Sequence, residues 1–542
     1  MSKEIELPAD YYLDNFLKLI RHSVEWYEPL LKSKEQKWIN KFICLKKNEQ
    51  CLLVRLLSRK GCWFRSDKLR YDEIESIPSA LVALEAAEFV TINPNIEVKD
   101  LCIHLLTKPE IVSLFPHLKA NLKKDQLIEL LPADLFKHHD SLSFAIIHLN
   151  HAEIINVLLA LFFGNTQQDL SQFVLNDLGL QQFENYSLEA IEPFFKHREQ
   201  LDQLLTVSTL QSQYYQDKPK DADSLLALLE KLPKDISHPH VERKKQHFIN
   251  LLARDLERLG EYTASLKWFS HNQLPPSRER RARIFDKLNQ HEKMSDIVTD
   301  MLSEPLNVAE QETATKLLHK LKRISGEKVP RVVKPKIKEY QLTLTKTHKR
   351  VEYCVKEYFE ALGYEVYYAE NTLLNGLFGL TFWQAIFAPI SGAFINQYQY
   401  RPLDLYHSDF RTKRHVTIEA CFKKLTEGST QDLINIYHDK ANISNPFVQW
   451  SRFDIHLLER SIQAIPLDTM VELFQVLFSD LKLYRNGMPD LILFKDLKYE
   501  WVEVKGPGDK IQDNQWRWFS QFLRIGVPFA VANVCFNNRI SS

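Results

Sequence analysis

The residues best suited to chemistry lie near the end of this 542-residue sequence, in the runs GMPDLILF and WVEVKGPGDK. Each run predicts a short strand, and a hairpin between the two would bring Asp490 beside Glu503. Because side chains alternate along a strand, Glu503 and Lys505 share one face. Two carboxylates held this close favour a cation between them, and oxygen-only ligands select Mg²⁺ or Mn²⁺.

The chemistry expected of such a site is phosphodiester hydrolysis. A divalent ion would polarise the scissile phosphate, and Lys505 would orient or deprotonate the attacking water and offset charge in the transition state. The alternative is a surface hairpin with an ordinary cross-strand pair between Glu503 and Lys505. Taken alone, Pro-Asp followed by Glu-X-Lys does not separate these two interpretations.

Composition limits what surrounds this site. The length predicts roughly three or four domains, and the scarcity of glycine, 14 residues in all, favours long helices over most of the chain. Formal net charge is zero, so any DNA-binding surface is expected to be a local patch. Seven scattered cysteines without a CxxC pair and an N-terminus without an apolar run predict a cytoplasmic protein.

One stretch could be mistaken for a membrane span. Residues 371–400 carry no charge and are long enough to cross a bilayer. Its glycines, Pro389 and Gln384 argue against that interpretation, as does the lack of a second span. We therefore expect a helix buried inside the nuclease core and no association with a membrane.

The region before residue 72 is predicted to be basic and helical. Six Lys or Arg residues from Arg55 to Arg70 interleave with Trp63, Phe64 and Tyr71, a mixture that suits phosphate contacts with some stacking. A solvated face is the alternative. The candidate DNA-binding residues in this run are Arg55, Arg59, Lys60 and Arg65.

The next region contains LFPHLKANLKKDQLIELLP, which predicts a small helix-turn-helix. Its leucines, from Leu118 to Leu131 and including Leu130, would fill the inside. Lys119, Lys123 and Lys124 would lie at the turn and contact DNA. The stretch resembles the SAP motif, a short DNA-binding module, and an ordinary helical hairpin is the alternative.

Helical repeats are predicted to follow. LLARDLERLGEYTASLKWF resembles a tetratricopeptide repeat (TPR), whose concave surface would bind a protein or only space two other parts. The sequence does not choose between these roles. The predicted divisions are a basic helical region (1–71), a SAP-like module (72–145), TPR-like repeats (146–322), a basic connector (323–350) and a nuclease domain (351–542).

A family resemblance covers nearly the whole chain. Pro-Asp, a spacer of about a dozen residues and Glu-Val-Lys form the signature of the PD-(D/E)XK nuclease superfamily, and WVEVKGPGDKIQDNQWRW resembles its virus-type replication-repair nuclease (VRR-NUC) domain. The chain as a whole resembles the Fanconi-associated nucleases in a bacterial-sized form. This resemblance implies a multidomain protein whose helical N-terminal two-thirds precede an α/β nuclease domain with a mixed central sheet.

The resemblance also implies roles for particular residues. Glu370, on the helix leading into the uncharged stretch, would be an early metal ligand. Asp490, Glu503 and the backbone carbonyl of Val504 would complete the set, Lys505 would be the catalytic lysine, and Gln515 matches a glutamine of the superfamily. The candidates for contacts with the DNA backbone near this site are Arg411, Lys413, Arg414, Lys510, Arg517 and Arg524.

The function implied is a structure-selective DNA nuclease of phosphodiesterase I type, with 5′ flap endonuclease and 5′-to-3′ exonuclease activity in interstrand crosslink repair. A junction resolvase or restriction-like endonuclease is one alternative. A DNA-binding repeat scaffold with an inactive nuclease domain is another. We expect the protein to act at the bacterial nucleoid, and a protein partner on the repeats and a dimer on DNA both remain open.

Overall fold

The computed structural model describes residues 7–168, 170–186, 192–330, 334–345 and 348–537. The chain divides into two compact units. Unit 1 comprises Met1–Leu180, Pro193–Ser212 and Pro233–Val241, and unit 2 comprises Gln181–Glu192, Gln213–Leu232 and Glu242–Ser542. Within the described ranges, the structure has no helix long and apolar enough to cross a membrane.

Unit 1 is mainly helical and also contains a small antiparallel sheet in the order β1-β3-β2. Sequence analysis did not predict this sheet, because strands of three or four residues are too short to show an alternating pattern. Its elements are α1 (Tyr11–Tyr27), η1 (Glu28–Leu30), α2 (Ser33–Ile43), α3 (Lys47–Leu57), β1 (Trp63–Arg65), η2 (Ser66–Lys68), α4 (Ile77–Ala86), β2 (Val90–Ile92), α5 (Val98–His104), α6 (Lys108–Leu114), α7 (Lys124–Glu129), η3 (His139–Ser141), β3 (Ile146–Leu149), α8 (Ile154–Phe163) and α9 (Ser171–Asp177).

The predicted helix-turn-helix around Lys119 differs in detail from the structure. Residues 115–123 form no helix between α6 and α7. Leu118 and Leu127 are buried as expected, but Leu130 is 60% exposed, contrary to the prediction. The reason is that α7 ends at Glu129, so Leu130 is no longer held on the inner side of the helix.

The repeat region consists of helices joined by short turns, as predicted. They are α10 (Arg198–Asp217), α11 (Ala222–Glu230), α12 (Pro239–Arg258), α13 (Tyr262–Ser270), α14 (Ser277–Lys287), α15 (His291–Ser303) and α16 (Val308–Ile324). Helices α10 and α12 contribute residues to both units. Buried side chains such as Ala282, Met294 and Ala314 pack α14, α15 and α16 together.

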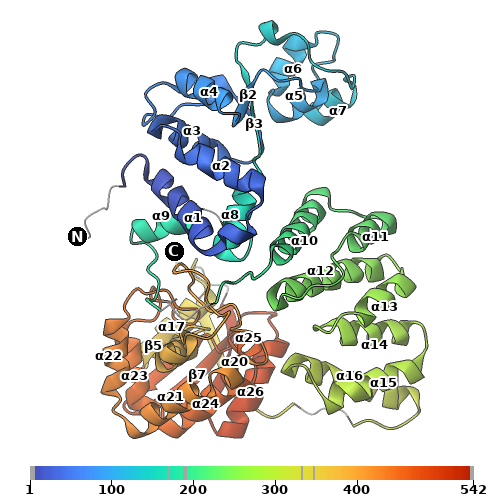
Figure 1. Ribbon diagram of the computed structural model, residues 1–542. Coiled ribbons are helices and arrows are strands. Elements are labelled where there is room, and N and C mark those ends of the chain that lie inside the picture. Colours follow the sequence, from blue (N-terminus) through green and yellow to red (C-terminus); the bar gives the residue numbers. More distant parts are fainter. Residues whose placement is uncertain (1–6, 169, 187–191, 331–333, 346–347, 538–542) are drawn as a thin grey trace. The chain divides into compact units, whose positions relative to one another are not determined.

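The C-terminal part of unit 2 is built on a five-stranded sheet in the order β4-β8-β7-β6-β5. Strands β5 and β7 of this sheet are labelled in Figure 1. The strands are β4 (Lys338–Thr345), β5 (Glu365–Tyr368), β6 (Leu491–Lys495), β7 (Lys498–Lys505) and β8 (Phe529–Asn537). Strands β4, β8 and β7 pair in parallel, whereas β7, β6 and β5 pair antiparallel. The sheet is therefore mixed, which confirms the prediction.

Helices cover both faces of this sheet. Val355 and Phe359 of α17 (Val351–Ala361) pack against Val502 and Val504 on one face. The other face, around Trp501, lies in a large core with the remaining helices. These are α18 (Leu373–Thr381), α19 (Trp383–Ile386), α20 (Phe410–Lys413), α21 (His415–Glu427), α22 (Gln431–Asp439), α23 (Ile455–Ala464), α24 (Leu467–Ser479), α25 (Leu481–Tyr484) and α26 (Asp513–Ile525).

The uncharged stretch 371–400 contributes α18 and α19 to this core. Every residue of α18 is buried, as are Trp383, Ala385 and Ile386 of α19. The expected burial inside the nuclease core is thus confirmed, although the stretch forms two short helices rather than one.

Candidate active site

The two predicted strands form a hairpin that places Asp490 next to Glu503. A two-residue turn, Asp496–Leu497, joins β6 to β7, and Leu491 pairs with Val502. Asp490 directly precedes β6 and so reaches the level of Glu503. The backbone N–H of Val504 donates to Asp490 Oδ2 at 2.8 Å, which fixes the orientation of the carboxylate.

Backbone hydrogen bonds hold Glu370 next to Asp490. Strand β5 pairs with β6, and beyond it the N–H groups of Ala369 and Glu370 both donate to the carbonyl of Asp490, at 2.8 and 3.1 Å. Glu370 therefore lies in the turn before α18, not on a helix as the resemblance implied. Asn371 has a φ of +52°, outside helical geometry, so the helix begins only at Leu373.

An ion pair and hydrogen bonds connect the side chains of Lys505, Gln515 and Glu503. The Lys505 Nζ lies 2.9 Å from Glu503 Oε1 and donates to Gln515 Oε1 at 3.0 Å. The Gln515 Nε2 donates to the same oxygen of Glu503. Gln515 is oriented in turn by the N–H of Gln512, which caps α26 and donates to Gln515 Oε1 at 2.8 Å. The ammonium group of Lys505 is therefore fixed at the end of β7.

Gly487 allows the loop before Asp490 to approach α26. Its φ is +90°, and a Cβ atom there would come within 2.8 Å of the backbone oxygen of Asn514. Only glycine fits this conformation without displacing the helix. The GMPD run is thus placed against the start of the helix that carries Gln515.

The carboxylates of the site are electrostatically unfavourable without a cation. Burial, and next the charge of Glu370, raise the pKa of Asp490 to about 6, and the N–H of Val504 opposes this shift. Burial and the charge of Asp490 raise the pKa of Glu503 to about 8, against the opposing charge of Lys505. Glu503 Oε2 is buried without a hydrogen-bond partner. Buried, mutually repelling oxygen ligands fit a hard divalent ion.

Glu352 also belongs to this acidic environment, and sequence analysis missed it. It lies in the first turn of α17, and its charge raises the pKa of Asp490 further. It acts in the same direction on the pKa of Tyr368, which burial raises first. A single glutamate near a helix start is a common feature, so its sequence carried no usable signal.

A group of cations in unit 2 was also missed. Burial, followed by the charges of Arg243, Lys482 and His407, lowers the pKa of His247. Burial alone lowers the pKa of Lys244 to about 8. Burial lowers the pKa of Arg243, and the charge of Asp409 opposes this shift. The charges of Arg243 and Lys482, which both act on His247, favour an anionic ligand. We call Arg243, Lys244, His247, His407 and Lys482 the cation cluster.

This cation cluster is linked to the active-site turn. Lys482 lies in α25, and Arg485 follows that helix directly. Asn375 Nδ2 donates to the carbonyl of Arg485 at 2.9 Å and to that of Asn371 at 2.7 Å. In sequence, ERKKQH resembles any solvated helix face, so only the effect of Lys482 and His407 on the pKa of His247 distinguishes it.

The DNA-binding candidates of unit 1 differ in their surroundings. Arg55 pairs with Glu73 at 2.6 Å, and Arg65 is 9% exposed and pairs with both Asp67 and Glu110. Arg59 donates to the hydroxyl of Tyr71, and Lys124 donates to the carbonyl of Ile103. The candidates whose side chains are exposed are Arg59, Lys60, Lys119 and Lys123.

In unit 2, Arg414 is fully buried and forms a bidentate pair with Asp404 at 2.8 and 2.9 Å, which indicates a structural role. Arg517 pairs with Glu312 and Arg524 with Glu472. The other candidates are Arg411, which donates to Gln475, Lys413, which pairs with Asp409 at the surface, and Lys510, which is exposed.

We expect the metal-free protein to lose stability as pH rises from about 5 to about 8. The folded state keeps protons on Asp490 and Glu503 that the unfolded chain has already released, so raising pH favours unfolding. In Glu503→Gln the side chain at this position cannot ionise, so the variant should lose less stability than wild type over the same pH range. Thermal unfolding in EDTA across this range, with Asp496→Asn as control, checks the prediction. Parallel pH profiles for wild type and Glu503→Gln would contradict it.

The mixed sheet, with Asp490 at the start of one strand and Glu503 and Lys505 at the end of the next, defines a nuclease domain. The family model for the VRR-NUC domain matches residues 425–536, and the model for the FAN1 HTH domain matches residues 10–91.

Comparison of whole chains gives the family. The chain is 34% identical to the Fanconi-associated nuclease 1 homolog of Pseudomonas aeruginosa, over 97% of this chain and 95% of that protein. It is 22% identical to human Fanconi-associated nuclease 1, over 97% of this chain and 62% of the human protein. The chain belongs to the Fanconi-associated nuclease family and is a DNA nuclease.

A solved structure agrees with this assignment. The crystal structure of paFAN1 bound to DNA with a 5′ flap of 2 nucleotides and a gap matches with a TM-score of 0.91 and 32% identity. The match covers 99% of this chain and 100% of that one.

Proposed function

We propose that this nuclease is structure-selective and cuts DNA at 5′ flaps, with 5′ flap endonuclease and 5′-to-3′ exonuclease activity of phosphodiesterase I type. The observation that carries the proposal is the match over nearly the whole chain to a structure that holds 5′ flap DNA. We expect a role in interstrand crosslink repair at the nucleoid. The predicted division into five regions also remains a proposal.

The acidic residues are suited to hold Mg²⁺ or Mn²⁺. Asp490 and Glu503 would bind the ion first, and Glu370 and the carbonyl of Val504 would complete the site. Within the described residues, no three Asp, Glu, His or Cys side chains form a ready-made metal cluster, so we expect these ligands to converge on binding. When bound, the ion supplies a Lewis acid for the scissile phosphate and balances the buried carboxylates.

Lys505 is the residue best placed to assist the reaction itself. Its ammonium group is held by Glu503 and Gln515 and is nearly excluded from solvent, so its charge is weakly screened. There it can offset charge that develops on the phosphate oxygens, or move a proton at Nζ. Gln515 acts through Lys505 and Glu503 as a positioning residue.

The cation cluster is proposed to bind a phosphate of the substrate close to the cut. We expect Arg243→Glu with Lys482→Glu to weaken binding of 5′ flap DNA by about tenfold or more, because an anion would replace two cations. The control is Lys498→Glu, an exposed charge at the far end of β7. Fluorescence anisotropy in EDTA measures the affinity. Equal affinities for the double variant and the control would contradict this role.

A panel of DNA shapes tests the proposed function. The purified protein is incubated with 5′-flap, 3′-flap, four-way junction and plain duplex DNA, in Mg²⁺, Mn²⁺ or EDTA. Cleavage of the 5′ flap that is lost in EDTA supports the proposal. Symmetric cuts at the junction would favour a resolvase, and binding without cleavage in any metal would favour a scaffold.

A further inference from the structure

Helix α26 carries the active-site residue Gln515 in its first turn, outside the hydrophobic core. The buried residues of this helix begin only at Trp518. The backbone N–H groups of a first turn have no partners within the helix, so the position of the turn depends on other contacts. Because Gln515 donates to Glu503 and accepts from Lys505, a displacement of this turn would be passed on to both side chains.

An ion pair between α26 and the repeat helix α16 lies next to this turn. Arg517, two residues after Gln515, donates from two nitrogens to the two carboxylate oxygens of Glu312, at 2.7 and 2.8 Å. The Arg517 side chain is 12% exposed, and the hydrogen bond to Glu312 raises its pKa despite this burial. A bidentate pair that is partly removed from water restrains both distance and direction. The pair therefore fixes α26 relative to α16.

The other contacts of the first turn restrain it less. Lys316 of α16 pairs with Asp513 at 3.2 Å, but these side chains are 66% and 83% exposed, and exposed pairs contribute little. Lys334 lies over the ring of Trp516, 4.3 Å from its centroid, and the loop at Gly487 also approaches this turn. Within the described ranges, the bidentate pair is thus the polar contact that best restrains α26 against α16.

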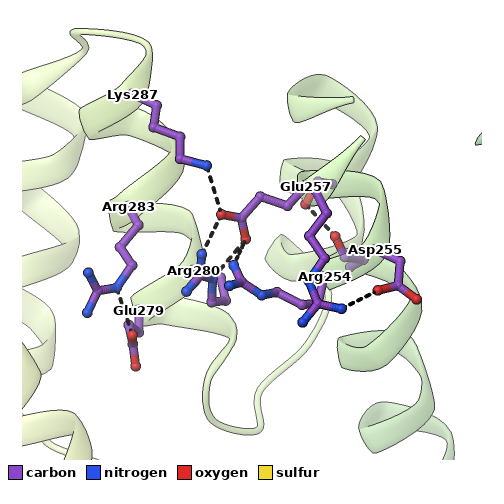
Figure 2. A network of polar contacts seen from close by, with 10 residues as sticks. Arg254, Asp255, Glu257, Glu279, Arg280, Arg283 and Lys287 are labelled. Carbon is purple, nitrogen blue, oxygen red and sulfur yellow. Dashed lines mark hydrogen bonds and ion pairs between the residues drawn. The ribbon is translucent and has the colours of Figure 1, made fainter. Parts of the chain in front are cut away.

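Helix α16 is itself held by ion pairs within the repeat region. Arg278 of α14 forms a bidentate pair with Glu310 of α16, at 3.0 and 2.6 Å. Helix α14 is joined in turn to α12, because Arg280 of α14 is directed toward Glu257 of α12 (Figure 2). The Glu257 side chain is 1% exposed, so water screens this pair only weakly. Glu312 therefore lies on a helix whose position its neighbours fix.

We propose that Glu312 and Arg517 are positioning residues of the nuclease. Their pair acts through Gln515, which holds the ammonium group of Lys505 in place. The inference rests on the catalytic role proposed for Lys505. Arg517, a candidate for contacts with DNA, directs its donor groups toward Glu312 instead. Since a displacement of about 1 Å can slow a reaction about a hundredfold, a restraint outside the active site can control the rate without touching the substrate.

The test compares Glu312→Gln with Glu472→Gln in the full-length protein. Glu472 is a matched control, because it pairs with Arg524 near the other end of α26. Single-turnover cleavage of a 5′-flap substrate and its affinity in EDTA are measured for each variant. We expect Glu312→Gln to lower the rate about tenfold. Its DNA affinity should be no weaker than that of wild type, because the change removes a negative charge. The control should match wild type in both quantities.

A second comparison separates positioning from a general loss of stability. Gln515→Ala removes the group through which the pair acts, so adding Glu312→Gln to this variant should slow cleavage no further. Arg517→Lys keeps the charge but loses the bidentate geometry, and it should slow cleavage as Glu312→Gln does. Glu312 is 37% exposed, so we expect thermal unfolding to show that the fold is kept.

A Glu312→Gln rate equal to that of wild type would overturn the inference. Equal slowing by Glu312→Gln with and without Gln515→Ala would also overturn it, because the pair would then act on the fold as a whole. A parallel loss of DNA affinity would make the pair a binding determinant instead. Failure of wild type to prefer the 5′ flap would refute the proposed function separately, and the variants would then be compared on the DNA that wild type cuts.

Discussion

Lys505→Ala is expected to abolish cleavage while DNA binding is kept. The ammonium group is fixed at 2.9 Å from Glu503 and 3.0 Å from Gln515, in a site that excludes most solvent. Its positive charge can therefore act strongly on the transition state but contributes little to holding a long DNA substrate. We expect the single-turnover rate to fall by on the order of a thousandfold.

The control for this variant is Lys498→Ala, because Lys498 begins the same strand and is exposed. Cleavage and anisotropy assays on one labelled 5′-flap substrate give both quantities. A Lys505→Ala rate within a few fold of wild type would remove the lysine from catalysis. A variant that loses binding as much as cleavage would make it a binding residue instead.

Asp490→Asn is expected to abolish both metal binding and cleavage. Asparagine has nearly the same shape, and its side-chain oxygen can still accept the N–H of Val504, so the hairpin should keep its geometry. What is lost is the negative charge that a divalent cation requires. We expect the metal affinity to fall by on the order of a hundredfold or more, because loss of a group that only supports a ligand already costs about 10- to 100-fold.

Calorimetric titration with Mn²⁺ measures this loss directly, and Asp496→Asn in the exposed hairpin turn is the matched control. The same variant should lower the pKa of Glu503, since the charge of Asp490 contributes to raising it. Metal affinity equal to that of wild type would show that Asp490 is not a ligand.

The hairpin of the active site was predictable because its signals are local. Alternation places Glu503 and Lys505 on one face, and a short polar connection closes β6 onto β7. The neighbourhood of Glu370 depends instead on the pairing of β5 with β6, between residues more than a hundred positions apart. No local pattern encodes that pairing, so only the family resemblance pointed to Glu370.

The sequence does not predict which Lys and Arg side chains are buried in ion pairs and which are exposed. Arg414 and Lys413 are neighbours in sequence and were treated alike, yet Arg414 is buried against Asp404 whereas Lys413 is exposed. Conversely, no feature of the sequence distinguishes Arg243 and His247, which folding places near Lys482. Whether a cation balances a buried acid or remains available to a phosphate is decided by packing, which composition and spacing do not encode.

The most direct measurement is the single-turnover rate on a 5′-flap substrate compared with a 3′-flap substrate of the same sequence, in Mg²⁺ and in EDTA. We predict rapid cleavage of the 5′ flap in Mg²⁺, at least about tenfold faster than the 3′ flap, and none in EDTA or with Asp490→Asn. Equal rates on both flaps, or cleavage that persists in EDTA, would contradict a metal-dependent, 5′-flap-selective nuclease centred on Asp490, Glu503 and Lys505.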